Sequence, residues 1–122
     1  MKQEEHKEQA TLIEWWAILC RELGYPQDML FAIPNGGARN AITGAMLKAE
    51  GVRRGIPDLF LAMPSCCFHG LFIEMKKTKG GVVSEYQKNI HEQLRNQGYD
   101  VAICKGWAEA RQVICEYLGV WL

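Results

Sequence analysis

The sequence predicts a single α/β domain. Helix-like and strand-like apolar patterns alternate along the chain, and 122 residues are enough for one hydrophobic core with little room for a second. The hydrophobic fraction of 48% and the charged fraction of 23% exclude a disordered or collagen-like chain. We therefore expect one domain over residues 1–122, with elements in the order helix, strand, helix, strand, strand, helix, strand, helix.

The first part of the chain is expected to form a helix, a strand and a second helix. Residues 4–23 carry apolar side chains at the spacing of an amphipathic helix, and a glycine and a proline follow them. Residues 29–33 form a short apolar run that ends at Pro34, which predicts a strand that enters a loop. Residues 41–50 have a helical pattern that ends at Gly51.

An antiparallel hairpin is expected next. Residues 58–63 and 71–76 are two apolar runs of strand length, and the loop between them contains Pro64 and Gly70. Short apolar runs bounded by turn residues in this way are typical of paired strands.

The last part of the chain is expected to form a helix, a strand and a final helix. Ser84 and Gln87 have the spacing of a capping box, so a helix should begin there and run to about residue 97. Residues 99–104 alternate and are rich in apolar side chains, which predicts a strand. Residues 107–118 return to helical spacing.

Charge is distributed unevenly along a chain that is neutral as a whole. The 14 Lys and Arg residues balance the 14 Asp and Glu residues, so net charge alone gives no sign of a nucleic-acid partner. Residues 51–88, however, contain six basic and three acidic residues, a local balance of +3. A cation bound to the acidic residues there would make this region more positive still.

The cysteines and the N-terminus favour an intracellular, cytoplasmic protein. The N-terminus lacks the apolar run and cleavage site of a secretory signal, and no apolar stretch approaches the roughly 18 residues of a membrane span. The cysteine count is odd and no C-x-x-C pair occurs, so we expect reduced, mostly buried thiols rather than a disulfide framework. Cys66, Cys67 and His69 could form half of a metal site, but no second ligand pair follows. The cysteines are Cys20, Cys66, Cys67, Cys104 and Cys115.

A group of acidic and basic side chains in the predicted hairpin suggests a catalytic site. Glu74 and Lys76 should emerge on the same face of their strand, because neighbouring side chains point to opposite faces. If the hairpin folds about the middle of its loop, facing residue numbers sum to about 133, which brings Asp58 level with Met75. A shift of one residue pairs Asp58 with Glu74 or Lys76 instead. Asp58, Glu74 and the backbone carbonyl of Met75 could then hold a hard cation such as Mg²⁺.

Such a site would suit phosphodiester hydrolysis. The cation would polarise the scissile phosphate, while the ammonium of Lys76 could orient the attacking water or stabilise the pentavalent phosphorane. Lys77 and Lys79 could follow the phosphate backbone. The same residues also have an explanation without catalysis, in which Asp58 caps a strand and Glu74 forms an exposed ion pair with Lys76.

Longer stretches of the chain carry a family resemblance. They are residues 34–39 (PNGGAR), 47–52 (LKAEGV), 56–61 (IPDLFL), 70–76 (GLFIEMK), 84–87 (SEYQ) and 98–101 (GYDV). With these segments in this order, the sequence closely resembles the virus-type replication-repair nucleases, the VRR-NUC family of the PD-(D/E)xK superfamily. The resemblance implies a restriction-endonuclease-like core with a mixed β-sheet flanked by α-helices, dependence on Mg²⁺ or Mn²⁺, and phosphodiester cleavage in DNA.

The resemblance also implies roles for single residues. Asp58 and Glu74 match the metal-binding carboxylates and Lys76 the catalytic lysine. Gln87 matches the glutamine at the start of the next helix, although its capping position explains it without catalysis. The family also has a glutamate in its first helix, and Glu5 fits that pattern best.

Helical geometry supports Glu5 as well. At about 100° per residue, Glu5 and Gln9 fall near the centre of the apolar stripe of the first helix, whereas Glu14 falls opposite to it. A carboxylate that points inward needs a partner, and a metal would be one. Solvent at a frayed helix end is the alternative.

Several basic or polar residues are expected to contact DNA. Asn35 and Arg39 lie in a glycine-containing loop after the first strand, where an ordinary turn is the alternative explanation. Arg53 and Arg54 precede the predicted metal-binding strand. The four tryptophans are expected in the core or in an interface. The histidines have no counterpart in the family pattern and no expected role; they are His6, His69 and His91.

The sequence thus predicts a metal-dependent DNA endonuclease that reads DNA shape and backbone charge rather than bases. Stand-alone VRR-NUC proteins resemble Holliday-junction resolvases, so branched DNA is the candidate substrate, a homodimer the expected assembly and a phage in a bacterial host a candidate source. Two alternatives stay open. One is a non-catalytic DNA-binding module on the same fold, and the other is a ribonuclease.

Overall fold

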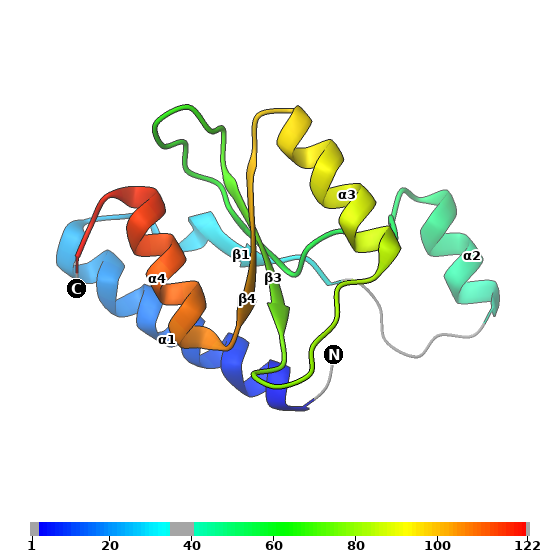
Figure 1. The fold of residues 1–122 in the computed structure, drawn as a ribbon, viewed down its shortest axis with the longest axis horizontal. Helices are drawn as coiled ribbons and strands as arrows, with labels where there is room; N and C mark the ends of the chain where they lie inside the picture. The colour runs from blue at the N-terminus through cyan, green and yellow to red at the C-terminus, as the bar shows by residue number, and fades with distance from the viewer. Residues whose placement is uncertain (1–2, 35–40, 122) are drawn as a thin grey trace.

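The structure, a computed structural model, describes residues 3–34 and 41–121, with only the backbone of residues 41 and 42. Helices and strands follow the predicted order (Figure 1). The elements are α1 (Gln3–Leu23), the short 3-10 turn η1 (Gln27–Met29), β1 (Leu30–Ala32), α2 (Ala41–Ala49), β2 (Leu59–Leu61), β3 (Leu71–Lys76), α3 (Glu85–Asn96), β4 (Asp100–Lys105) and α4 (Trp107–Leu118).

The four strands form one mixed sheet in the order β1-β2-β3-β4. β1 and β3 both pair antiparallel with β2, whereas β4 pairs parallel with β3. A parallel pair needs a crossover connection, and α3 provides it. The α/β class and the mixed sheet with flanking helices are therefore confirmed.

The register of the β2–β3 hairpin is one residue away from the expected one. At the tip, Ser65 faces Phe68, and their numbers sum to the expected 133. In the strands the sum is 132, with Leu59 opposite Ile73. The difference arises because residues 62–64 face only residues 69–70 between the tip and the strands, so one side carries an extra residue. Continued beyond β2, this register brings Asp58 level with Glu74 rather than Met75.

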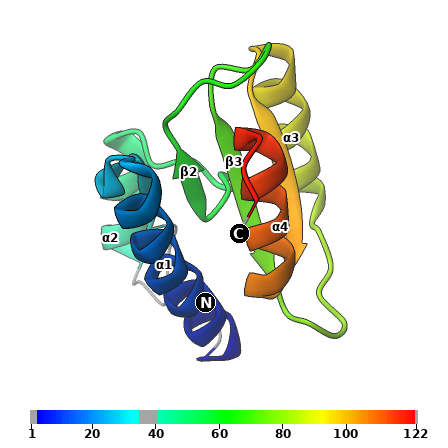
Figure 2. The same cartoon turned by 90° about the vertical axis from the view of Figure 1, so that its left-hand side faces the viewer.

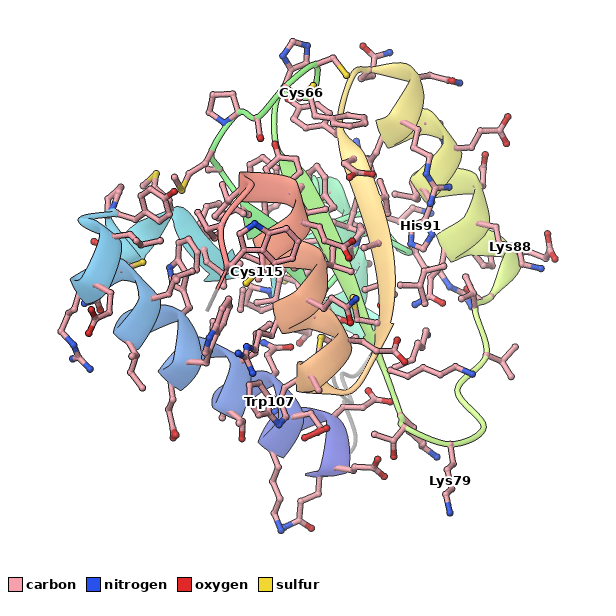
Figure 3. The ribbon with its side chains drawn as sticks, turned by 60° about the vertical axis from the view of Figure 1, so that its left-hand side comes forward. Cys66, Lys79, Lys88, His91, Trp107 and Cys115 are labelled. Carbon is pink, nitrogen blue, oxygen red and sulfur yellow. The ribbon has the colours of Figure 1, made fainter. Side chains whose placement is uncertain are left out.

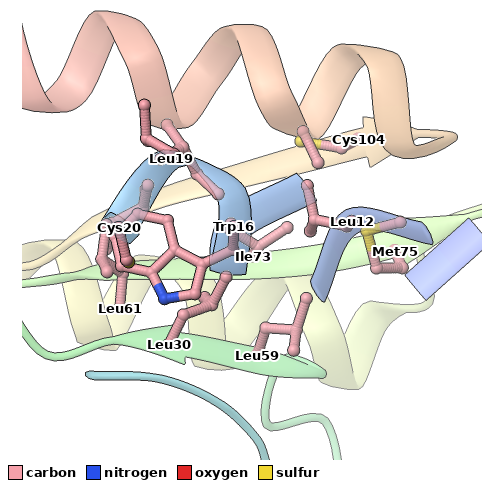
Figure 4. Close-up of a cluster of buried hydrophobic side chains, with 13 residues drawn as sticks. Leu12, Trp16, Leu19, Cys20, Leu30, Leu59, Leu61, Ile73, Met75 and Cys104 are labelled. Atoms are coloured by element: carbon pink, nitrogen blue, oxygen red, sulfur yellow. The ribbon is translucent and has the colours of Figure 1, made fainter. Parts of the chain in front are cut away.

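One face of the sheet carries the main core. Leu71, Ile73 and Met75 alternate along β3, are at most 1% exposed and pack against α1 and α4 (Figure 4). Burial of each such side chain contributes roughly 1.5–3 kcal/mol. Trp16 of α1 completes this layer, and its indole N–H donates to the carbonyl of Gln27 at 2.9 Å. The expected core role is confirmed for Trp16, whereas Trp121 is 83% exposed.

The opposite face of the sheet carries aromatic side chains and α3. Phe72 stacks on Phe60 with ring centroids 4.3 Å apart, and Tyr99 meets both rings edge-on. α3 lies across the sheet from α1 and α4 (Figures 1 and 2). Because alternate residues of β3 face opposite sides, Glu74 and Lys76 are directed to the α3 side.

The position of α2, the state of the cysteines and the search for membrane-spanning helices complete the description of the fold. α2 stands apart from the sheet at one end of the molecule (Figure 1). All five cysteines are free thiols, of which three are buried, while Cys66 and Cys67 are exposed at the hairpin tip. Within residues 3–34 and 41–121, no helix is long and apolar enough to cross a membrane.

Candidate active site

The unequal lengths of β2 and β3 create the first part of the site. β3 continues to Lys76, whereas its pairing with β2 ends at Ile73, so the edge of β3 beyond this point lacks a strand partner. Asp58 takes that place, and its Oδ2 atom accepts a hydrogen bond from the Met75 N–H at 2.7 Å. The N–H and C=O of a strand residue point to the same edge, so the Met75 carbonyl also faces the Asp58 side.

Glu74 meets Asp58 in the second part of the site. Its side chain is only 3% exposed and forms a hydrogen bond with the Asp58 carboxyl group. Burial, this hydrogen bond and the negative charge of Asp58 raise the pKa of Glu74 to about 9, against an opposing effect of Lys76 and a further raising effect of Glu5. This raised pKa favours the protonated form of Glu74 at neutral pH in the metal-free protein.

Lys76 is held by the residue that caps α3. Its Nζ atom donates to Gln87 Oε1 at 3.0 Å. The same oxygen accepts from the Ser84 N–H at 2.9 Å, and Ser84 Oγ accepts from the Gln87 N–H at 3.2 Å. The predicted capping box is thus present, and its glutamine also orients the lysine.

These side chains line one cleft of about 650 Å³. Asp58, Glu74, Lys76 and Gln87 all contribute to it, and Glu5 contributes from α1. Met75 contributes through its backbone, since its side chain is buried in the core on the other face. The cleft therefore brings together the residues that were predicted from the hairpin, the capping box and the first helix.

The α1 wall of the cleft contains an acceptor without a partner. The Oε1 atom of Gln9, one helical turn after Glu5, is buried and lacks a hydrogen-bond partner among the described residues. A buried acceptor of this kind commonly marks the place of a water molecule or an ion. Glu5 itself is half-buried on the same wall.

The donors in the cleft fit a hard divalent cation. The described residues contain no group of three His, Cys, Asp or Glu side chains close enough together to hold a metal, so Glu5 does not join the two carboxylates in one ligand cluster. Two carboxylates and a backbone carbonyl are nevertheless the oxygen donors that Mg²⁺ takes, because it retains several waters. The carboxyl groups of Asp58 and Glu74 hydrogen-bond to each other and line the same cleft, so their oxygens converge.

The predicted DNA-contacting residues are distributed unevenly around this cleft. Arg54 lines it, and its guanidinium lies 3.8 Å from the ring centroid of Tyr86. Arg53 is exposed and lies outside the lining. Neither Lys77 nor Lys79 lines the cleft, and Lys79 points away from the body of the protein (Figure 3). The predictions for Asn35 and Arg39 concern residues that lie outside the described ones.

The loop that contains Lys77 and Lys79 is held against α1 by hydrogen bonds. The N–H and the hydroxyl of Thr78 both donate to Glu4 Oε1, at 3.2 and 2.8 Å. These hydrogen bonds and the positive charge of Lys77 lower the pKa of Glu4. Lys77 therefore belongs to a loop that is fixed beside the cleft rather than inside it.

His91 is a site residue that the sequence analysis missed. It is 2% exposed on α3, and its Nε2 atom lies 3.4 Å from Glu74 Oε1 (Figure 3). Burial lowers the pKa of His91, as do the charges of Arg95 and Lys76, and this shift favours the neutral imidazole. The sequence does contain a signal for His91 as a site residue, because it follows Gln87 by four residues and therefore shares its face of the helix.

Comparisons with known proteins agree with this arrangement. The sequence profile of the VRR-NUC domain matches residues 3–108, a stretch that includes every residue lining the cleft. A solved structure described as "VRR_NUC domain protein" superposes with a TM-score of 0.80 at 25% sequence identity, covering 98% of this chain and 92% of that one. No curated protein matches the chain in sequence.

Proposed function

Because the chain belongs to the VRR-NUC domain family, a family of nucleases, we propose that it is a divalent-metal-dependent DNA endonuclease that hydrolyses phosphodiester bonds. The observation that carries this proposal is the convergence of Asp58, Glu74 and Lys76 in one cleft. Two carboxylates beside an ammonium are the groups that such a reaction requires.

Asp58, Glu74 and the Met75 carbonyl are the proposed ligands of Mg²⁺ or Mn²⁺. When bound, the ion would supply Lewis acidity at the scissile phosphate. Glu74 has to release its proton before it can act as a ligand. The Met75 N–H keeps Asp58 in place, so the first carboxylate needs little rearrangement.

Lys76 is the proposed catalytic residue at the reacting phosphate. In the reaction a water oxygen forms a bond to phosphorus, and the bond between phosphorus and the leaving sugar oxygen breaks. The ammonium of Lys76 can donate to the water or to a phosphate oxygen on which negative charge develops. Gln87 fixes the direction of this ammonium through its Oε1 atom, which reduces the loss of side-chain freedom on reaction.

The proposed substrate is DNA recognised by its backbone, with Holliday-junction-like branched DNA as the candidate. Arg54 at the cleft provides a group that binds phosphate, and contacts of this type carry no base information. A homodimer would present two such clefts, which suits the two-fold symmetry of a four-way junction. The finer proposal of branched DNA and a homodimer is drawn from the resemblance of the sequence to stand-alone VRR-NUC proteins.

Cleavage of labelled substrates tests the function. Duplex, flap, splayed-arm and four-way DNA, with an RNA duplex for comparison, are incubated with Mg²⁺ or Mn²⁺. Asp58→Asn retains an acceptor for the Met75 N–H but removes the charge, and Lys76→Met removes the ammonium. Both should lose activity by about 100-fold or more, whereas the surface variant Lys88→Met should not. Cutting that is unchanged in Asp58→Asn and Asp58→Ala would overturn the proposal.

A further inference from the structure

An arginine lies over a tyrosine ring at the cleft that contains the proposed metal ligands. The Arg54 guanidinium lies 3.8 Å from the centroid of the Tyr86 ring, and both residues line the cleft. They come from different parts of the fold, because Arg54 precedes β2 and Tyr86 belongs to the first turn of α3. The sequence predicts a DNA-contacting role for Arg54 but no role for Tyr86.

The backbone next to Arg54 is shaped to allow this contact. Gly55 has a φ of +89°, a conformation that side-chain-bearing residues rarely adopt. A Cβ atom at this position would lie 2.7 Å from the Tyr86 carbonyl oxygen. Only glycine allows the segment before β2 to approach α3 this closely, so the position of Arg54 relative to Tyr86 is fixed by the backbone.

Among residues 3–34 and 41–121, no carboxylate forms an ion pair with Arg54. The neighbouring carboxylate of Glu85 lies 3.4 Å from Lys88 instead. An arginine stacked on an aromatic ring still exposes the N–H donors at its edge, which match two oxygens of a phosphate. The pair therefore presents an oriented cation to an anion in the cleft.

We propose that Tyr86 is a positioning residue that holds the Arg54 guanidinium flat, so that its edge binds a backbone phosphate adjacent to the scissile one. This inference rests on the proposed DNA substrate but not on cleavage. The ring of Tyr86 acts through Arg54 and does not stack on a base. The ligand class is a phosphodiester oxyanion of a nucleic-acid strand.

Binding of a fluorescein-labelled 20-base-pair DNA duplex in metal-free buffer, measured by fluorescence anisotropy, tests this inference. Tyr86→Leu removes the ring and should weaken binding about two- to fivefold, the factor expected for an exposed cation–π contact. Tyr86→Phe retains the ring and should restore the affinity. Arg54→Lys retains the charge but loses the flat guanidinium, and should weaken binding at least as much as Tyr86→Leu.

A double variant separates positioning from direct stacking. If Tyr86 acts through Arg54, Tyr86→Leu should have no further effect in an Arg54→Lys background. Additive losses would overturn the inference, as would wild-type affinity in both single variants. Arg111→Lys is the matched control, since Arg111 lies 6.0 Å from the Trp15 ring outside the cleft.

Failure of the inference can be told from failure of the proposed function. If the variants bind the duplex in this pattern but the protein cuts no DNA, the Arg54–Tyr86 site is supported and the nuclease proposal is overturned. If the protein cuts DNA but all these variants bind like the wild type, the nuclease proposal is supported and the Arg54–Tyr86 inference is overturned. Circular dichroism tests whether each variant is folded. If Tyr86→Leu does not fold, Arg54→Lys still tests the inference.

Discussion

Replacement of Glu74 by glutamine should remove a large pH dependence from the stability of the metal-free protein. Glu74 is buried beside Asp58, and its pKa is raised from an ordinary value of 4.5 to about 9. The folded protein therefore keeps a proton that the unfolded chain releases above pH 4.5. The stabilisation from this group is fully present below pH 4.5 and is lost as the pH rises towards about 9.

The size of this effect follows from one proton. A difference of one bound proton changes the free energy of unfolding by about 1.4 kcal/mol per pH unit. Between pH 5.5 and 7.5 the contribution of Glu74 should therefore fall by about 3 kcal/mol. This figure requires only that the folded-state pKa lies well above 7.5. A glutamine has no proton to lose, and its NH₂ group can donate to Asp58 as the protonated carboxyl does.

Urea unfolding at pH 5.5 and 7.5, with EDTA present, measures this difference. The free energy of unfolding of Glu74→Gln relative to the wild type should rise by about 3 kcal/mol over that interval. Glu85→Gln is the matched control, because its side chain is 89% exposed and should follow the wild type. If Glu74→Gln shows the same pH dependence as the wild type, then Glu74 is not protonated in the fold and the proposed convergence with Asp58 is wrong.

Three further predictions concern the metal, the cap and the thiols. Mg²⁺ should raise the melting temperature of the wild type but not of Asp58→Asn, and its apparent affinity by calorimetry should increase with pH because Glu74 must release its proton; an affinity independent of pH would contradict this. Ser84→Ala and Gln87→Ala should each cost about 1 kcal/mol in urea unfolding, but only Gln87→Ala should lower kcat, because it alone frees Lys76; equal kcat values would refute the positioning role. A colorimetric thiol reagent should modify the two hairpin cysteines in the native protein and the three buried ones only after unfolding, and rapid modification of all five would contradict the fold.

The elements of the fold could be predicted because their signals are local. Apolar spacing gave the helices and strands, and the pair Ser84 and Gln87 gave the start of α3. The register of the hairpin could not be predicted to the residue. It depends on an extra residue in the 62–64 segment, and no local pattern marks that irregularity.

The sequence predicted which residues form the candidate site, but not the raised pKa of Glu74 or the contact between Arg54 and Tyr86. Asp58, Glu74 and Lys76 follow from strand alternation and family resemblance, and they do meet in one cleft. The protonated state of Glu74 depends on burial that α3 and its His91 help to create. The stacking of Arg54 on an aromatic ring depends on a close backbone approach between two separate segments. Both are tertiary effects that sequence spacing does not encode.

Asp58 and Glu74 are proposed to hold one divalent ion together, beside Lys76. A crystal structure of the protein with Mn²⁺, in which the ion is located by its anomalous scattering, tests this most directly. We predict one anomalous peak within about 2.3 Å of carboxylate oxygens from both residues, close to the Met75 carbonyl. A peak that contacts neither carboxylate, or a cleft without an ion at saturating Mn²⁺, would contradict it.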